Sequence, residues 1–411
     1  MRKKLFLYFI FCLAVSAVKA EDVVRIIQLQ ESGTLEAMLG ESPDEIDSIV
    51  VSGPMNAQDW ESLRQCCLYG RVRGIDMSEV IAENDSMPNG ALAHLSSRGI
   101  LKNIRLPKTL RVMGPRALKW CTSLEHVELP ETLKRIGYEA FYNCISLRHI
   151  DLPATLETIG NAAFYFGRLE EVTIPEGLIN MGAEAFTGNL NLKVVRIPAR
   201  IQNPGWATFR GCWTLEQASL SPDTEVIPAL MFQDCEAMTT FEWPSGLKEI
   251  GSNAFESCLI KRIILPDGVR IVNREAFRHN NSLIVLGLPA TLEYFDETAL
   301  MGCERQLKAV NCMALVPPAT GDYPYYREEI RTSVAKATLY VPIGCKEAYS
   351  NAPYWHNFGD IVEYDYSEYP TAITEQSLDV TPNGDKYGLD GRVITTTPGG
   401  IYIQNGKKYV K

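Results

Sequence analysis

Histidine is the side chain in this sequence best suited to acid–base or metal chemistry, but none of the five histidines belongs to a known catalytic or metal-binding motif. The chain contains no His-Glu-x-x-His pair, which zinc peptidases use to place two ligands and a base on one helical face. It also lacks the Gly-x-Ser-x-Gly turn of a nucleophilic serine and a Gly-x-Gly-x-x-Gly turn after a strand. We therefore expect a protein that is not an enzyme and that carries no metal or cofactor. The five histidines are His94, His126, His149, His279 and His356.

Two columns of polar residues emerge when the sequence is aligned on an internal repeat. Neighbouring members of a column should lie about 5 Å apart on successive strands, close enough for two histidines to form a pH-sensitive or metal-accepting cluster. A solvated strand face of mixed charge and a contact surface for a partner are the alternatives. The first column contains Asn103, His126, His149 and Glu171, and the second contains Arg105, Glu128, Asp151, Thr173 and Arg196.

Aromatic residues provide a second candidate binding surface. Trp206 and Trp213 lie on either side of Phe209, and exposed indole rings can stack on sugars or anchor protein partners. In a repeat protein such rings also serve as turn or cap packing. Tyr323, Tyr325 and Tyr326 belong to a segment with Gly and Pro, which favours a surface loop available for contacts.

The element that must position these residues is a repeat of about 23 residues from Leu101 to Cys312. One copy reads Ile136-Gly137-x-x-Ala140-Phe141-x-x-Cys144. A period of 20–30 residues is typical of a solenoid, in which stacked coils bury one continuous core. We therefore expect about nine coils of 22–24 residues, with the phenylalanines stacked inside. The phenylalanine column reads Phe141, Phe164, Phe186, Phe209, Phe232, Phe255 and Phe277, with Leu118 and Leu300 at its ends.

Each coil should begin with a short parallel strand. In Leu124–Pro130 the alternation predicts that Leu124, Val127 and Leu129 point inward and that His126 and Glu128 point outward. A glycine recurs four residues before most of the column phenylalanines, which indicates a backbone position with special requirements. Because Asn and Asp replace this glycine in two coils, we expect a left-handed backbone there. Pro228 occupies the same position and cannot adopt that conformation, so its coil should bend differently.

Cysteine recurs three residues after the phenylalanine of most coils. A ladder of disulfides is one interpretation for an exported protein. Parallel side chains on coils about 4.8 Å apart do not suit a disulfide, whose Cβ atoms lie about 3.8 Å apart and face each other. Since asparagine occupies the same column, we expect buried thiols at a hydrogen-bonding turn. The cysteines are Cys121, Cys144, Cys212, Cys235, Cys258 and Cys303.

The first 20 residues predict a secretory signal peptide. Basic residues at 2–4 precede an apolar run and small residues near Ala20. Four of the 40 basic residues and none of the 50 acidic residues lie in this segment, so the mature chain carries a formal charge of −14. This acidity argues against nucleic acid and anionic membranes as partners. No later apolar segment is long enough to span a membrane.

The repeat pattern L-x-x-I-x-L-P-x-x-L-x-x-I-G-x-x-A-F-x-x-C resembles the leucine-rich repeats of the BspA-like family of bacterial surface proteins. Segments near Ile49–Asp59 and Leu339–Phe358 are similar to the family's two caps, and we expect a helix near 57–66. Residues 388–408 are similar to C-terminal sorting tails of the same phylum. The resemblance implies a right-handed coil of short parallel strands with N- and C-terminal caps and a small β-rich tail. It brings no catalytic residues.

The resulting organisation has five parts. Residues 1–20 form the signal peptide, 21–100 the N-terminal cap region, 101–313 the leucine-rich repeats, 314–366 the C-terminal cap with its tyrosine-rich insertion, and 367–411 a linker and sorting-like tail.

The resemblance implies adhesion or ligand binding by an exported protein at the cell surface, secreted or in the periplasm. The expected partner is a host matrix protein, a mucin or glycan, or another bacterial surface protein, bound by a monomer. Two alternatives remain open: a carbohydrate-capture accessory protein of a nutrient-uptake system, and an architectural component of the envelope without a soluble ligand.

Overall fold

The structure is a computed structural model that describes residues 23–40, 43–95, 100–198, 201, 204–366, 401–404 and 407–410. The predicted signal peptide and most of the predicted tail lie outside these residues. The chain divides into two compact units, Met1–Leu169 and Glu170–Lys411. No helix among the described residues has the length and apolar character needed to cross a membrane.

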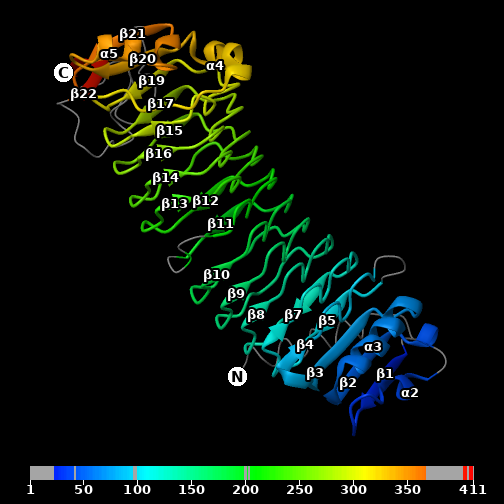
Figure 1. Cartoon of the computed structure of the whole chain (residues 1–411). Coiled ribbons are helices and arrows are strands. Elements are labelled where there is room, and N and C mark those ends of the chain that lie inside the picture. Colours follow the sequence, from blue (N-terminus) through cyan, green and yellow to red (C-terminus); the bar gives the residue numbers. More distant parts are fainter. Residues whose placement is uncertain are drawn as a thin grey trace. The chain divides into compact units, whose positions relative to one another are not determined.

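The first unit is built on two parallel sheets whose strands follow one another coil by coil (Figure 1). Helices occur only before the repeats begin. The strands of one sheet are β1 (Val24–Gln28), β2 (Ser48–Met55), β3 (Gly74–Ala82), β5 (Asn103–Arg105) and β7 (His126–Glu128). The other sheet contains β4 (Ser86–Met87), β6 (Val112–Met113), β8 (Arg135–Ile136) and β9 (Thr158–Ile159). The helical elements are α2 (Leu35–Leu39), η1 (Pro43–Glu45), α3 (Ala57–Tyr69) and η2 (Glu83–Asp85).

Helix α3 confirms the helix that the sequence predicts in the N-terminal cap. Its N-terminus is fixed by a capping box, in which the Asn56 side chain accepts bonds from the backbone N–H groups of Gln58 and Asp59. The buried Asp59 carboxylate accepts further bonds from the N–H groups of Asn56 at 3.0 Å, Gly33 at 2.6 Å and Leu35 at 3.0 Å. One buried carboxylate therefore joins α3 to the segment that leads into α2.

The second unit continues the same pattern in its own strands (Figure 1). One parallel sheet contains β13 (Val226–Ile227), β14 (Glu249–Ile250), β16 (Ile271–Val272) and β18 (Tyr294–Phe295). Another contains β15 (Arg262–Ile264), β17 (Val285–Leu288), β19 (Ala309–Cys312), β20 (Thr338–Pro342) and β21 (Asp360–Tyr364). Its remaining elements are β10 (Asn180–Met181), the pair β11 (Val194–Arg196) and β12 (Gln217–Ser219), η3 (Pro324–Tyr326), α4 (Arg327–Val334), α5 (Lys346–Asn351), η4 (Trp355–Asn357) and the antiparallel hairpin β22 (Ile401–Gln404) and β23 (Lys407–Val410).

The core confirms the predicted solenoid interior. All seven phenylalanines of the column are at most 1 % exposed. In the first unit the rings of Phe141 and Phe164 stack with centroids 5.0 Å apart and an interplanar angle of 5°. In the second unit Phe186 and Phe209 stack at 5.6 Å and 8°. The ring spacing follows the separation of neighbouring strands, so the aromatic ladder and the sheets share one repeat distance.

The predicted role of the glycine column is wrong. Its glycines do not have positive φ; the left-handed residues lie instead two positions later, as at Glu139 (φ 53°), and two positions after the phenylalanine, as at Asn143 (φ 59°). The glycine is needed for space, because a Cβ atom on Gly137 would lie 2.7 Å from the carbonyl carbon of Gly114 in the preceding coil. Pro228, Asn273 and Asp296 carry side chains at the same position, so the need for space applies to the coils that have glycine there. The fixed negative φ of Pro228 fits a backbone that is not left-handed.

The cysteine column consists of buried free thiols, as the sequence predicts. The Cys144 Sγ donates to the carbonyl oxygen of Leu118 in the preceding coil at 3.2 Å. Burial raises the pKa of this thiol to about 12. Asn280 substitutes for the thiol and donates to the carbonyl oxygen of Phe255 at 2.6 Å, which explains why asparagine is accepted in the column. The same Sγ-to-carbonyl bond recurs at Cys121, Cys212, Cys235, Cys258 and Cys303.

Replacing Gly137 by alanine should force two coils apart. We expect Gly137→Ala to lower the free energy of unfolding by about 1–3 kcal/mol, the usual cost of overpacking a rigid contact. Gly74→Ala is the matched control in the same unit, because its Cβ would meet only the Ser48 side chain, at 3.3 Å. Urea denaturation of both variants makes the comparison. Equal stabilities of the two variants would contradict the role assigned to Gly137.

Candidate functional site

On the outward strand face of the first unit, charged side chains form ion pairs with one another. The guanidinium group of Arg105 on β5 donates to Asp76 at 3.0 Å and to Glu128 on β7 at 2.7 Å. The parallel register of β3, β5 and β7 places these three residues side by side. Glu128, a predicted contact residue, is therefore already paired within the protein.

The other predicted members of this face are exposed. His126 projects from β7, whereas His149 and Asp151 lie outside the named strands. Among the described residues, no group of three or more His, Cys, Asp and Glu side chains is arranged to hold a metal ion. The histidine column therefore presents exposed polar side chains at the surface.

The strand face of the second unit is more open. Val194 and Arg196 on β11 pair in parallel register with Gln217 and Ser219 on β12, and Ser219 forms a bridge with Glu242. Two shallow hollows, about 320 and 260 Å³ in volume, lie on this face. We call them together the strand-face groove. Its outward-facing lining residues are Glu171, Thr173, Val194, Arg196, Gln217, Ser219, Thr240 and Glu242.

Arg196 places a positive charge in the strand-face groove. It lines both hollows together with Val194, whose side chain is 44 % exposed. Unlike Arg105, Arg196 forms no ion pair with any residue that the structure describes. An exposed valine beside an unpaired guanidinium group can bind an apolar side chain and an adjacent carboxylate.

Glu171 and Arg196 are thus brought to one surface, as the sequence columns predict. The sequence prediction missed the continuation of the same columns into later coils. Gln217 and Ser219 follow Val194 and Arg196 by strand register, and Glu242 follows Ser219. Extending the alignment by two coils would have found them.

Both tryptophans that the sequence singles out are exposed. Trp206 follows Gly205 and is 49 % exposed, whereas Trp213 follows Cys212 and is 54 % exposed. They occupy different turn positions of one coil. Each ring is accessible, so each could contribute a separate contact.

The tyrosine-rich segment is not the simple loop that the sequence predicts, because residues 324–326 form η3 and lead directly into α4. Tyr323 is anchored by its hydroxyl group, which donates to Asp296 at 3.0 Å, and by Arg274, whose guanidinium carbon lies 5.6 Å from the ring centroid. Tyr326 is partly buried, whereas Tyr325 is 97 % exposed. Only Tyr325 therefore has the exposure expected of a contact loop.

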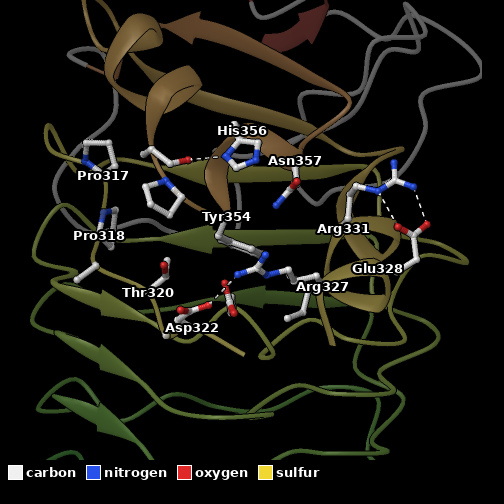
Figure 2. Close-up of a pocket in the computed structure, with 16 residues that line it drawn as sticks. Pro317, Pro318, Thr320, Asp322, Arg327, Glu328, Arg331, Tyr354, His356 and Asn357 are labelled. Carbon is white, nitrogen blue, oxygen red and sulfur yellow. Dashed lines mark hydrogen bonds and ion pairs between the residues drawn. The ribbon is translucent and has the colours of Figure 1, made fainter. Parts of the chain in front are cut away.

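A pocket in the C-terminal cap was not predicted from the sequence. It has a volume of about 790 Å³, and Figure 2 shows its walls. Pro317 and Pro318 form one side, Arg327 and Arg331 of α4 contribute another, and His356 of η4 faces them. These residues come from segments outside the periodic pattern, so no repeat alignment could have grouped them.

The two arginines at equivalent strand positions should differ in their effect on stability. Arg105→Ala removes charged hydrogen bonds to two carboxylates from a side chain that is 21 % exposed, and should lower the free energy of unfolding by about 1–3 kcal/mol. Arg196→Ala should change it by about 0.5 kcal/mol or less. Chemical denaturation of both variants measures the difference. A larger loss for Arg196→Ala would show that Arg196 is a structural residue.

Several solved structures resemble the chain at low sequence identity. A leucine-rich repeat protein from Bacteroides ovatus is 20 % identical, with a TM-score of 0.47 over 68 % of this chain and 87 % of the other. The pneumococcal vaccine antigen PcpA is 15 % identical, with a TM-score of 0.44 over 85 % and 91 %. A leucine-rich cell surface protein from Faecalibacterium prausnitzii is 16 % identical, with a TM-score of 0.36 over 75 % and 90 %. Among curated proteins, none matches the chain.

The repeats themselves identify the family. The model of the BspA-type leucine-rich repeat region matches residues 95–216 and 205–317 in six copies, which together cover more than half of the chain. The short parallel strands, the buried phenylalanine ladder and the strand register described above are consistent with this match. The chain therefore belongs to the family of proteins with BspA-type leucine-rich repeats.

Proposed function

We propose that this protein is a non-enzymatic adhesion protein that binds other macromolecules outside the cell, and that the strand-face groove of its second unit is the contact surface. Membership in a leucine-rich repeat family supports protein binding as the general role. A solved relative in Faecalibacterium prausnitzii is described as a cell surface protein, which supports an external location. Export would depend on residues 1–20, and retention at the surface on the tail after residue 366.

The unpaired Arg196 beside the exposed Val194 is the observation that carries the proposal. Protein interfaces combine an apolar centre with a few charged groups that fix orientation, and arginine is enriched among their strongest contacts. The groove offers both features at Val194 and Arg196, two positions apart on the outward face of β11. A protein partner that presents a carboxylate next to an apolar side chain fits this arrangement.

A glycan is the second candidate ligand, supported by the exposure of Trp206 and Trp213. Sugar binding by these rings would depend on stacking and would be insensitive to salt. Binding by Arg196 would weaken as ionic strength rises. Salt dependence therefore separates the two ligand classes.

The test is a binding screen of the mature chain against immobilised host matrix proteins, mucins and a glycan panel. We expect binding to a matrix protein that weakens when ionic strength rises from about 0.05 to 0.5 M. Arg196→Glu should weaken this binding at least tenfold, corresponding to about 1.4 kcal/mol. Arg210→Glu is the matched control, because Arg210 is also exposed but follows Phe209 in a turn outside the groove.

Equal losses in the two variants would assign the effect to net charge rather than to the groove. Salt-insensitive glycan binding that is lost in Trp206→Ala or Trp213→Ala would replace the protein-binding proposal by the carbohydrate alternative.

A further inference from the structure

The pocket of the C-terminal cap has an acidic corner. Glu297 lines the pocket, follows the buried Asp296 in the chain and lies near Asp322. One Glu297 carboxylate oxygen accepts a hydrogen bond from the Tyr323 N–H at 2.8 Å, and Glu297 forms no ion pair with any described residue. Burial, together with the negative charges of Asp296 and Asp322, raises the pKa of Glu297. The corner therefore carries more negative charge than its own protein neighbours neutralise.

Of the two arginines in the pocket wall, Arg331 is paired within its own helix, whereas Arg327 lies near the acidic corner, where its positive charge acts to lower the pKa of Glu297. Arg331 donates two hydrogen bonds to Glu328 on the same helix, at 2.6 and 3.1 Å. Arg327 lies 3.7 Å from Asp322, and both side chains are more than 70 % exposed, so this pair is weak. Figure 2 shows Arg327 beside Asp322, with Arg331 and Glu328 paired farther along α4. A cation from outside would complement the charge that remains at Glu297.

The surface next to the pocket is aliphatic. Leu315 and Val316 are 71 % and 75 % exposed and lead directly into the pocket wall at Pro317. Ile343 is 65 % exposed, and the Sγ of the nearby Cys345 lies 3.3 Å from the Leu315 carbonyl oxygen. Exposed aliphatic side chains gathered beside a pocket are typical of a protein contact surface. Tyr354, the tyrosine in the lining, is only 2 % exposed, so it offers no ring face for a sugar.

We propose that this pocket binds a lysine or arginine side chain of a partner polypeptide, whose neighbouring apolar residues cover Leu315 and Val316. The cationic group would pair with Glu297, and its methylene groups would pack against Pro317 and Pro318. A free amine would leave the aliphatic border exposed, and a sugar would leave the carboxylate without a counter-charge. The inference extends the proposed protein-binding function by a second contact, independent of the strand-face groove.

Short peptides test this pocket directly. The mature full-length chain is titrated with an acetylated, amidated peptide that carries arginine between leucines, and with the same peptide carrying citrulline, which removes only the charge. We expect the arginine peptide to bind at least tenfold more tightly by calorimetry or NMR titration. Glu297→Gln should reduce its affinity to that of the citrulline peptide.

Glu329→Gln is the matched control, since it removes one negative charge from an exposed residue of α4 that does not line the pocket. If Glu297→Gln fails to fold, Thr320→Lys, which places a tethered cation in the pocket, should abolish arginine-peptide binding. Arg196→Glu should leave peptide affinity unchanged, so failure of the groove proposal and failure of this proposal give different results.

Acidification supplies a second readout. Because burial raises the pKa of Glu297, lowering the pH protonates this carboxylate and removes the charge that binds the cation. The negative charges of Asp296 and Asp322 beside Glu297 favour the cation, whereas the positive charge of Arg327 opposes it. Affinity should therefore fall as pH falls.

Three results would overturn the proposal. The first is equal affinity, or no detectable binding, for both peptides. The second is an unchanged affinity in Glu297→Gln. The third is binding that appears only after residues 367–411 are removed, which would identify the chain's own C-terminal segment as the occupant.

Discussion

The close approach of successive coils at the repeat glycine is the constraint on which the other features depend. A side chain at Gly137 or Gly251 would place Cβ within 2.7 Å of the preceding coil's backbone. The backbone N–H at this position bonds to the preceding coil, as Gly251 does with Ile227 at 2.8 Å, and Asn273 and Asp296 make the same bond where they replace glycine. The same spacing lets the phenylalanine rings stack and lets each column cysteine reach a carbonyl group of the coil before it. The cysteines of the column are thus buried and hydrogen-bonded as free thiols, and the described residues form no disulfides.

A fixed coil spacing also turns the outward residues into columns whose charges either satisfy one another or remain available. Lys102 bonds to Glu125 at 2.7 Å, and Lys134 bonds to Glu157 at the same distance, each from one coil to the next. Arg105 is similarly held by two carboxylates. At Arg196 the column provides no carboxylate that pairs with the guanidinium group among the described residues, and the side chain lines the strand-face groove. The proposed binding surface therefore coincides with a position at which the column charges are not paired within the protein.

The periodic part of the structure could be predicted from sequence because one spacing specifies it repeatedly. The buried phenylalanines, the thiol column and most of the strands follow from that spacing, whereas the strands predicted at residues 147–152 and 169–174 are not formed. The prediction of a left-handed backbone at the glycine column was wrong because both a left-handed backbone and close packing favour glycine, and the residue type does not tell which applies. The left-handed conformation occurs instead at residues such as Glu139 and Asn143. The pocket of the cap was beyond prediction, since Glu297 of the last coil meets Pro317, Arg327 and His356 only through the folding of the aperiodic segments that follow the repeats.

Native-state hydrogen exchange of the repeat-glycine amides tests the central constraint most directly. If the coils are held at a fixed spacing, the Gly205 and Gly251 N–H groups, bonded to Met181 and Ile227 of the preceding coils, should exchange only when their unit unfolds. Their opening free energies should then match the free energy of unfolding from denaturation and should be unaffected by Arg196→Glu. Exchange as fast as that of the exposed turn at Trp213 would contradict the account, because it would mean that the coils separate locally and that the outward columns have no fixed register.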